Sequence, residues 1–484
     1  MSEQKEWFKD YYFLGLLILI IIYIITRIKF LFTGSMWPDE ALYAWYGLNL
    51  LRNPVFILSS EFWSYHPPLF SIIIAFFNIF LNKEVAARIV SPLFGLAGII
   101  LIYYLGKELK NKLVGLLAAI MLTFNHLFWF FNDRILLDGP LTTMFIATAY
   151  TLLRYAKEKT VKNLIIFIII LFLTFLIKRV SVAILPFVII YLVYTYWDKL
   201  KKNKYLLASI IIIILLIITI LYLVKFEIFR INVHEFINNI FSLETLKSIL
   251  EVKLVFLVTW YIMPFLILGM IFLIIYRHHD YFFPFLFILS IIGMRVLAQS
   301  AGLPRYILPA LPGILLLAAL AIDELKELII EMSNIRIPNL VFIIIVLLLC
   351  IPIYNQGDQL NLYKSYTYTG FREAGEFIKN NIPEQTTIYV GSGRATRFYS
   401  ERTNLENLPR TIQELKQLRT GAYLEVDAWE YLQPDYVYPF SNEKFQQLDS
   451  LGFKPVKIIK KEYMTSKGLK KIPVVIIYQR TGLE

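Results

Sequence analysis

Apolar runs about twenty residues long recur along most of the first 357 residues of this chain. A helix of about 20 apolar residues crosses the hydrocarbon core of a bilayer, so each run is long enough to span it. The composition agrees, because 58% of the 484 residues are hydrophobic and only 17% are charged. Soluble proteins are nearer a quarter charged. The chain is therefore predicted to be a mainly α-helical, polytopic membrane protein.

About eleven runs qualify as membrane-spanning helices. They cover residues 11–32, 86–106, 113–131, 139–156, 163–178, 182–197, 205–224, 254–276, 281–300, 306–322 and 339–354. The first is too long for the apolar part of a signal peptide and is predicted to stay as an anchor helix. A further apolar stretch at 68–80 is short and follows Pro67 and Pro68. It is predicted to lie along the membrane surface, since counting it as a span would reverse every later loop.

The formal charge of +12 lies mainly in short clusters between the apolar runs. Membrane proteins carry Lys and Arg in such loops on the cytoplasmic side, so nucleic acid is not an expected partner. With 68–80 interfacial, the lysine-rich loops 107–112, 154–162 and 198–204 fall on one face together with the N-terminus. That face is predicted to be cytoplasmic. The loop 33–85, the loop near 226–252 and the C-terminal part then lie outside the cell membrane.

The composition changes after residue 357, and residues 358–484 are predicted to form a small external α/β domain. Amphipathic stretches alternate there with short β-rich runs, namely 371–382 and 443–453 with 386–392 and 472–479. Residues 1–357 form the transmembrane domain. Two features of the chain indicate little. The Gly-x-Gly at 391–394 is more typical of a strand-to-helix turn than of a phosphate loop, and the single cysteine, Cys350, allows neither a disulfide within the chain nor a cysteine metal motif.

With this topology the unusual charged residues gather on the outer face. They are Asp39 and Glu40 at the start of the first external loop, His66 before the proline pair, Asp133, Arg134 and Asp138 in the next external turn, Lys178 and Arg179 at the end of a span, and Arg305 with Tyr306 at the start of another. If 39–52 is a helix, Asp39, Tyr43 and Tyr46 share one face.

Each of these residues also has a purely structural explanation. Acids are favoured in the first turn of a helix, Lys178 and Arg179 suit the end of a span, and Asp133 with Arg134 is expected to be a solvated local pair. Together these explanations give no reason for acids and bases to concentrate on the less charged side. The cluster therefore indicates a site.

Carboxylates and cations beside a bilayer suit the transfer of a sugar from a lipid phosphate. The leaving group is an anionic lipid phosphate, which Lys, Arg or charged His stabilises. The acceptor is a hydroxyl or amine, and it needs a carboxylate to take its proton. No cofactor is required, although a divalent metal stays an open alternative.

Five stretches, taken in order, resemble a known family. They are WPDEALYA (37–44), YHPPLF (65–70), DRILLDGPLT (133–142), LIKRVSVAILP (176–186) and, more weakly, PRYILPALP (304–312). They resemble the GT-C superfamily of integral-membrane glycosyltransferases, which use polyprenyl-phosphate sugars. The nearest branch holds the lipid A aminoarabinose transferases and the bacterial and archaeal relatives of the protein O-mannosyltransferases. The resemblance covers about the first two thirds of the chain and implies a GT-C transmembrane fold.

The resemblance implies a catalytic carboxylate at Asp39, a second functional acid at Asp138, and phosphate contacts from His66, Lys178 and Arg305. Glu40, Tyr43, Arg179 and Tyr306 complete the predicted substrate-binding set, with Glu40 either orienting the loop or binding sugar hydroxyls. No metal ligand is predicted. The aminoarabinose transferases place an acid and a lysine before the proline, where this chain has Tyr65 and His66. A histidine there makes the expected phosphate contact pH-sensitive, and the departure argues against the aminoarabinose substrate.

The sequence thus predicts an inverting glycosyltransferase of the cell membrane. Its predicted partners are a polyprenyl-phosphate sugar, dolichyl or undecaprenyl, a lipid, glycan or protein acceptor, and the bilayer. A transporter or flippase for a lipid-linked or anionic solute is the alternative, and a receptor or assembly scaffold is a third. Transporters hide ionisable residues near the bilayer midplane, often on broken helices within inverted repeats. The spans here are nearly free of charge in their middles, and no inverted repeat is evident.

Overall fold

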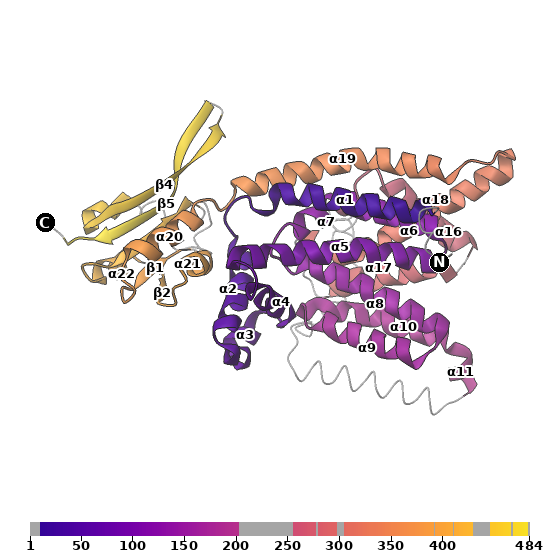
Figure 1. Cartoon of the computed structure of the whole chain (residues 1–484), viewed down its shortest axis with the longest axis horizontal. Helices are drawn as coiled ribbons and strands as arrows, with labels where there is room; N and C mark the ends of the chain where they lie inside the picture. Colours follow the sequence, from indigo (N-terminus) through magenta and orange to yellow (C-terminus); the bar gives the residue numbers. More distant parts are fainter. Residues whose placement is uncertain are drawn as a thin grey trace, which may run out of the picture. The chain divides into compact units, whose positions relative to one another are not determined.

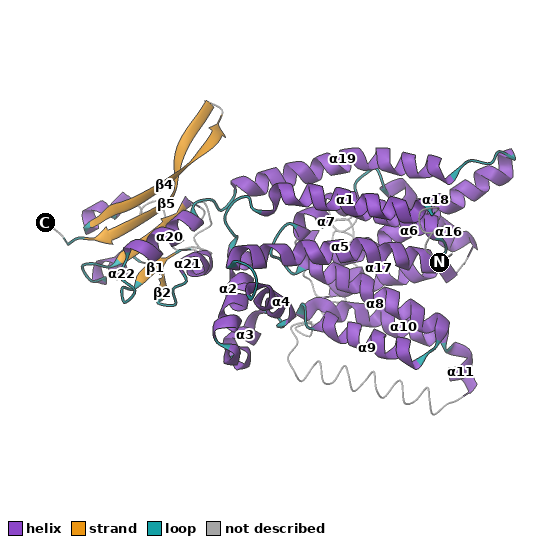
Figure 2. Ribbon diagram, viewed as in Figure 1, coloured by secondary structure: helices purple, strands orange, loops and turns teal. Residues whose placement is uncertain are grey.

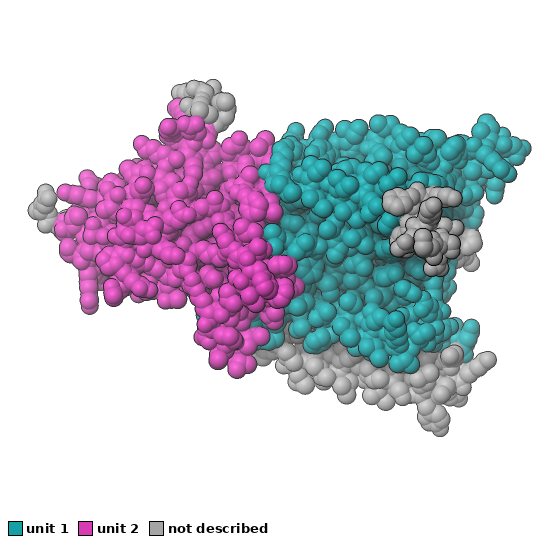
Figure 3. All heavy atoms as spheres, viewed as in Figure 1, with its two compact units in different colours: residues 1–29, 59–70, 89–360 teal, residues 30–58, 71–88, 361–484 magenta. Residues whose placement is uncertain are grey.

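The computed structural model describes residues 10–202, 255–276, 279–297, 304–391, 393–409, 411–428, 446–465 and 468–482. The predicted span 205–224 and the predicted loop near 226–252 lie outside these residues. The chain forms two compact units, which Figure 3 colours separately. Unit 1 comprises residues 1–29, 59–70 and 89–360, and unit 2 comprises residues 30–58, 71–88 and 361–484.

Unit 1 is built from helices (Figure 2). They are α1 (Tyr11–Leu31), α3 (Ser60–Tyr65), α5 (Lys83–Leu109), α6 (Lys112–Phe124), α7 (His126–Asn132), α8 (Asp138–Glu158), α9 (Val161–Phe175), α10 (Leu185–Thr195), α11 (Trp197–Lys202), α15 (Val255–Val258), α16 (Met263–Tyr276), α17 (His279–Leu297), α18 (Leu311–Ser333) and α19 (Asn339–Tyr366), with the short 3-10 helices η4 (Arg179–Ile184), η7 (Pro304–Tyr306) and η8 (Leu308–Ala310). Helices α5 and α19 each continue into unit 2, as does α4 (Leu69–Asn78).

The core of unit 1 is α18, which packs against α6, α16 and α17. The most apolar 18-residue window of the helix that spans residues 308–333 is 89% buried, whereas the corresponding window of α1 is 33% buried. Helix α1 packs against α5, where the Tyr23 hydroxyl donates a hydrogen bond to the Pro92 carbonyl at 2.9 Å. Figure 1 shows these two helices with roughly parallel axes. Partial burial of α1 leaves its outer face apolar and exposed, as a lipid-facing helix requires.

Four helices of the described chain are long and apolar enough to cross a membrane. A fifth span forms if α6 and α7 count as one, although they meet at an angle of 63°. The break falls at Asn125, whose side chain accepts hydrogen bonds from the backbone of Leu127 and Phe128 and so starts a new helix. The structure confirms a mainly helical membrane protein. Several other predicted spans are represented by apolar helices of 10–17 residues.

Helix α4 contains ten residues. At a rise of 1.5 Å per residue it is about 15 Å long, roughly half the thickness of the hydrocarbon core. This length agrees with the interfacial position predicted for residues 68–80. Elsewhere, small residues let two helices of unit 1 meet closely, as is common in membranes. A Cβ atom added to Gly115 of α6 would lie 2.3 Å from the Tyr103 carbonyl oxygen of α5, so this contact excludes any larger residue.

Unit 2 combines the first part of the chain after α1 with a C-terminal domain. Its helices are α2 (Pro38–Arg52), α20 (Phe371–Asn381), α21 (Gly393–Ser400) and α22 (Ile412–Gln417), with η3 (Pro54–Leu58) and η9 (Asp449–Leu451). Its strands are β1 (Ile388–Val390), β2 (Leu405–Asn407), β3 (Tyr423–Asp427), β4 (Phe453–Thr465) and β5 (Gly468–Arg480), in the order β2-β1-β3-β5-β4.

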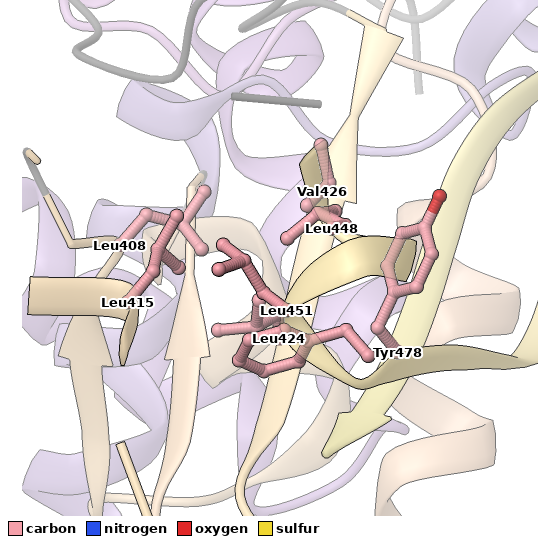
Figure 4. Close-up of a cluster of buried hydrophobic side chains, with 8 residues drawn as sticks. Leu408, Leu415, Leu424, Val426, Leu448, Leu451 and Tyr478 are labelled. Atoms are coloured by element: carbon pink, nitrogen blue, oxygen red, sulfur yellow. The ribbon is translucent and has the colours of Figure 1, made fainter. Parts of the chain in front are cut away.

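The sheet is mixed, because β2, β1 and β3 are parallel while β5 pairs antiparallel with both β3 and β4. Successive side chains of a strand point to opposite faces. Leu424 and Val426 of β3 belong to an apolar cluster with Leu408, Leu415, Leu448, Leu451, Phe453 and Tyr478, most of which Figure 4 labels. Glu425, between them, points the other way and meets Thr396 of α21. The structure therefore confirms the predicted C-terminal α/β fold.

Helix α2 packs against α21 of the C-terminal domain within unit 2. The backbone N–H of Met36 donates to the Tyr399 hydroxyl at 3.0 Å, and the Trp37 indole donates to the Thr367 hydroxyl at 2.9 Å. Glu401 adds ion pairs to Lys83 and Lys379. Residues 30–58 therefore fold together with the C-terminal domain, across the domain boundary that the sequence suggested at residue 357.

The buried Glu425 should make unit 2 less stable as the pH rises. Burial raises the pKa of this carboxyl from its ordinary value of 4.5 to about 8, with a further rise from the nearby Asp427, against the hydrogen bond from Thr396. The folded chain keeps the proton while the unfolded chain loses it above pH 4.5, so stability falls between pH 4.5 and 8 by about 1.4 kcal/mol per pH unit. Glu425→Gln, which never ionises, should remove this fall.

Thermal unfolding of the full-length protein in detergent at pH 5.5 and 7.5 measures the effect. The melting temperature of the wild type is expected to fall more from pH 5.5 to pH 7.5 than that of Glu425→Gln. Glu462→Gln, which changes a half-exposed carboxylate of β4, is the matched control and should behave as the wild type. A pH dependence that is the same in all three proteins would show that Glu425 does not hold its proton in the folded chain.

Candidate active site

Helix α2 holds the predicted acidic pair in its first turn. Pro38 suits the first position of a helix because its missing N–H is not needed there, and the helix dipole favours the two carboxylates that follow. Glu40 is 2% exposed, and its side chain accepts a hydrogen bond from the Trp37 backbone at 2.8 Å. This contact fits the role of orienting the loop. Tyr43, one turn further along α2, is buried.

Asp39 has a partner that the sequence did not indicate. Its Oδ1 atom accepts a hydrogen bond from Arg394 Nη1 at 2.9 Å, and the side chains are partly exposed, Asp39 by 32% and Arg394 by 40%. Arg394 lies in α21, at the end of the Gly-x-Gly stretch that sequence reasoning read as a plain turn. The two residues are 355 positions apart, so no local pattern could have paired them. The structure thus gives the predicted base a cationic neighbour.

Arg394→Gln should lower the rate of sugar transfer without destabilising the protein. Partly exposed ion pairs contribute less than about 1 kcal/mol to stability. A charge-assisted hydrogen bond that orients a reacting carboxylate is worth about 1.5–3 kcal/mol, which corresponds to about 10–100-fold in rate. The measurement compares initial transfer rates and melting temperatures, with Arg394→Lys expected to recover part of the rate. Unchanged transfer would mean that the pair does not serve the site.

A second group of predicted residues meets inside unit 1. Lys178 Nζ donates to Asp138 Oδ1 at 2.8 Å, and both side chains are almost completely buried. Asp138 is the first residue of α8, and Lys178 follows the end of α9 and precedes η4. The Lys178 ammonium also lies 5.7 Å from the centre of the Tyr306 ring. This is a buried ion pair beside an aromatic face.

Further cations surround this pair. Arg305 lies over the Tyr306 ring at 5.1 Å and donates to its hydroxyl at 3.2 Å. Arg179 donates to the Trp63 carbonyl at 2.8 Å. The segment that carries His66 is tied to the end of α9, because the Leu69 backbone donates to the Leu176 carbonyl at 3.0 Å. The structure therefore brings together Asp138, His66, Lys178, Arg179, Arg305 and Tyr306, whereas Asp39, Glu40 and Tyr43 lie on α2 in unit 2.

The electrostatics of His66 differ from the sequence prediction. Burial, followed by the positive charge of Lys178, lowers the pKa of His66 to about 3, and Arg179 and Arg305 lower it further against the opposing effect of Asp138. The ring is therefore neutral at pH 7. The sequence-based prediction that His66 is partly charged at neutral pH is wrong for the protein without bound phosphate. A neutral imidazole can still donate one hydrogen bond.

The expected solvated pair of Asp133 and Arg134 is also wrong. Both residues are 1–2% exposed. Asp133 accepts a hydrogen bond from the Trp129 indole at 2.6 Å and lies 3.8 Å from Arg27 of α1. Arg134 lies over the Phe130 ring at 4.9 Å. Asp133 thus links α7 to α1, because a buried carboxylate needs a charged or hydrogen-bonding partner.

The cluster in unit 1 is chemically suited to an anion. Lys178, Arg179 and Arg305 carry three positive charges around a neutral His66, against the single carboxylate of Asp138. Phosphate oxygens accept charge-assisted hydrogen bonds from such groups. Among the described residues no group of three or more His, Cys, Asp or Glu side chains could hold a metal ion.

Comparison with known proteins finds a family match for part of the chain. Residues 65–222 match the family described as dolichyl-phosphate-mannose-protein mannosyltransferase. No curated protein matches the chain. The fold is similar to that of ArnT from Cupriavidus metallidurans, with 14% identity over 96% of this chain and 99% of ArnT and a TM-score of 0.58.

Two further solved structures share the fold. The oligosaccharyltransferase of Archaeoglobus fulgidus is 12% identical, over 97% of this chain and 75% of its own, with a TM-score of 0.57. The arabinofuranosyltransferase AftD from Mycobacteria is 14% identical, over 97% of this chain and 40% of its own, with a TM-score of 0.54. At these identities the likeness establishes the fold.

The family match contains three of the five stretches on which the sequence resemblance rested, those at 65–70, 133–142 and 176–186. The same three stretches supply His66, Asp138, Lys178 and Arg179 to the cluster in unit 1. The resemblance is therefore confirmed by a family match and a shared fold. Residues 65–222 of the chain carry the match to the mannosyltransferase family, and the chain as a whole shares the fold of ArnT, the oligosaccharyltransferase and AftD.

Proposed function

We propose that this protein transfers a sugar, with inversion, from a polyprenyl phosphate to a lipid, glycan or protein acceptor at the outer face of the cell membrane. The observation that carries the proposal is the buried Lys178–Asp138 pair with Arg179, Arg305 and His66 around it. Two solved proteins of similar fold support the proposed donor. One is ArnT bound to undecaprenyl phosphate, and the other is AglB in complex with a dolichol-phosphate. We also propose the topology predicted from the sequence, with about eleven spans, a cytoplasmic N-terminus and an external C-terminal domain.

The cations act on the leaving group. As the bond between the sugar C1 and the phosphate oxygen breaks, the electron pair leaves with the phosphate. Lys178 and Arg305 stabilise that negative charge, because donors already in place need no reorganisation during the reaction. The neutral ring of His66 donates a hydrogen bond to the same phosphate. Asp138 holds Lys178 in position before the phosphate binds. Its negative charge also partly neutralises the positive charges of Lys178, Arg179 and Arg305.

The carboxylate of Asp39 acts on the acceptor. It takes the proton from the acceptor hydroxyl or amine while that group attacks C1, which is general base catalysis. A single displacement forms one bond to C1 as the other breaks, so the configuration at C1 inverts. Arg394 orients the carboxylate through the hydrogen bond at 2.9 Å, and Glu40 fixes the start of α2 by accepting from the Trp37 backbone. No step of this reaction requires a metal or other cofactor.

A transfer assay with purified protein in liposomes tests the proposed donor class. Radiolabelled polyprenyl-phosphate sugars are supplied with a membrane extract as the acceptor source, beside a parallel arm with nucleotide sugars. We expect label to move to an extract component only from the lipid-phosphate donors. Transfer from the nucleotide sugar alone would overturn the proposal. Movement of the intact lipid across the bilayer without transfer would favour the transporter alternative.

A further inference from the structure

A cavity with a mixed aromatic and polar lining lies in unit 1, and none of the residues of the site described above is among those that line it. It has a volume of about 640 Å³, within the range of about 300–1,000 Å³ usual for small-molecule sites. Its lining consists of His126, Phe256, Thr259, Trp260, Tyr261, Gln356, Gln359 and Leu360. These residues come from the start of α7, from the segment between α15 and α16, and from the later part of α19. All three parts lie near the outer ends of predicted spans.

Specific contacts hold the walls of this cavity in place. The Asn125 side chain donates to the Leu257 carbonyl at 2.8 Å and so joins α15 to the start of α7. The Trp129 ring stacks on Tyr354 with ring centres 5.0 Å apart. A Cβ atom on Gly357 would lie 2.5 Å from Trp129, so α19 approaches α7 closely here. Thr259 has a positive φ of 67°, which is uncommon for a β-branched residue and marks a constrained turn.

Two polar groups in this wall make no hydrogen bond of normal geometry with the described residues. His126 is 1% exposed, and neither ring nitrogen makes a hydrogen bond of normal geometry within the described chain, although the Phe256 backbone lies nearby. The Thr259 hydroxyl, in a side chain 5% exposed, also lacks a hydrogen-bond partner there. Buried polar groups are almost always hydrogen-bonded. These groups therefore suit a ligand that brings hydroxyl groups into the cavity.

The remaining lining matches a neutral sugar. Trp260 is 72% exposed, and Phe256 and Tyr261 each expose about two fifths of their surface, so aromatic faces are available for stacking. The amides of Gln356 and Gln359 can each donate and accept hydrogen bonds. None of the described residues that line the cavity is charged. A phosphate would find no cation among these residues, and an acyl chain would bury their polar groups without hydrogen-bond partners, which costs free energy.

We infer that this cavity binds a neutral sugar unit of the acceptor, so that the acceptor is a glycan or glycolipid. The inference rests on the proposed function in one respect. The sugar bound here is an acceptor only if the protein is a transferase, since a transferase needs a second sugar site beside that of the donor. The cavity is separate from the cluster of Lys178 and Asp138, so the two can be tested independently.

Saturation-transfer NMR with the full-length protein in lipid nanodiscs tests the inference, because detergents with sugar head groups would compete. The probes are the methyl glycosides of glucose, mannose, galactose and N-acetylglucosamine. We expect at least one to receive saturation from the wild type. Trp260→Ala should weaken its binding by about three- to tenfold, the effect of one aromatic stacking contact. Trp197→Ala, which changes an exposed tryptophan of α11 outside the cavity, should bind as the wild type does.

Equal binding by the wild type and Trp260→Ala would overturn the inference, as would the absence of binding for all four glycosides. A polyprenyl phosphate titration in the same nanodiscs separates the two proposals. If the lipid phosphate binds and no glycoside does, only the sugar cavity is refuted. If a glycoside binds in a manner that depends on Trp260 while no lipid-phosphate donor is ever consumed, the cavity stands and the proposed transferase reaction fails.

Discussion

Asp39→Asn is expected to lower the rate of sugar transfer by about 10²–10⁴-fold, because an amide cannot take the acceptor's proton as a general base does. The substitution keeps the shape of the side chain and an oxygen that accepts the hydrogen bond from Arg394. Stability should change by less than about 1 kcal/mol, since the ion pair is partly exposed. Initial rates of transfer from a labelled polyprenyl-phosphate sugar, measured in matched liposomes, give the comparison.

The chain offers a matched control for this substitution. Asp10 makes an ion pair with Lys112 at 2.6 Å and is exposed to a similar degree, in a part of unit 1 that holds none of the predicted site residues. Asp10→Asn should transfer sugar at the wild-type rate. If Asp39→Asn is equally active, the base lies elsewhere, and Asp138 becomes the next carboxylate to test.

Lys178→Met should have the largest effect on stability. It leaves the buried carboxylate of Asp138 without its cation, and removal of one partner of a buried pair costs about 3–5 kcal/mol. Donor binding should also fall, because the phosphate loses its central cation. Unfolding of the purified variant and its transfer rate, each compared with the wild type, measure the two effects separately.

A double variant distinguishes a functional pair from a structural one. Lys178→Met combined with Asp138→Asn leaves no buried charge, so it should recover most of the stability that the single variant loses. It should not recover donor binding or transfer. If the double variant regains both stability and transfer, the pair serves only to hold α8 and η4 together, and the phosphate site must be sought elsewhere.

Patterns local in the sequence predicted much of the fold. The periodic apolar runs predicted α1, α5 and α8 within a few residues of their observed ends, and they predicted the start of α19, which continues to Tyr366, twelve residues beyond the predicted end at 354. Proline and the acidic first turn marked the start of α2. The amphipathic stretch at 371–382 is α20, and the β-rich run at 472–479 lies within β5. These features depend on residues close together in the chain, which is why the sequence sufficed.

The sequence also predicted as site residues six residues that the structure gathers in unit 1. It could do so because each lies near the outer end of a predicted helix. It could not predict properties that depend on distant contacts. The pKa of His66 follows from its burial and from Lys178 and Arg179. Asp133 lies 3.8 Å from Arg27 of α1, which is distant in the sequence. Arg394, which holds Asp39, comes from the far end of the chain.

The central claim is that the cations around Asp138 hold a lipid phosphate, and direct binding tests it most simply. Native mass spectrometry of the purified protein with polyprenyl phosphate would count bound lipid for the wild type and for the stable Lys178→Met/Asp138→Asn variant. We predict one lipid phosphate bound to the wild type and at least about tenfold weaker binding to the variant, since a charge-assisted contact is worth about 1.5–3 kcal/mol. Equal binding by both proteins, or none by the wild type, would contradict the account.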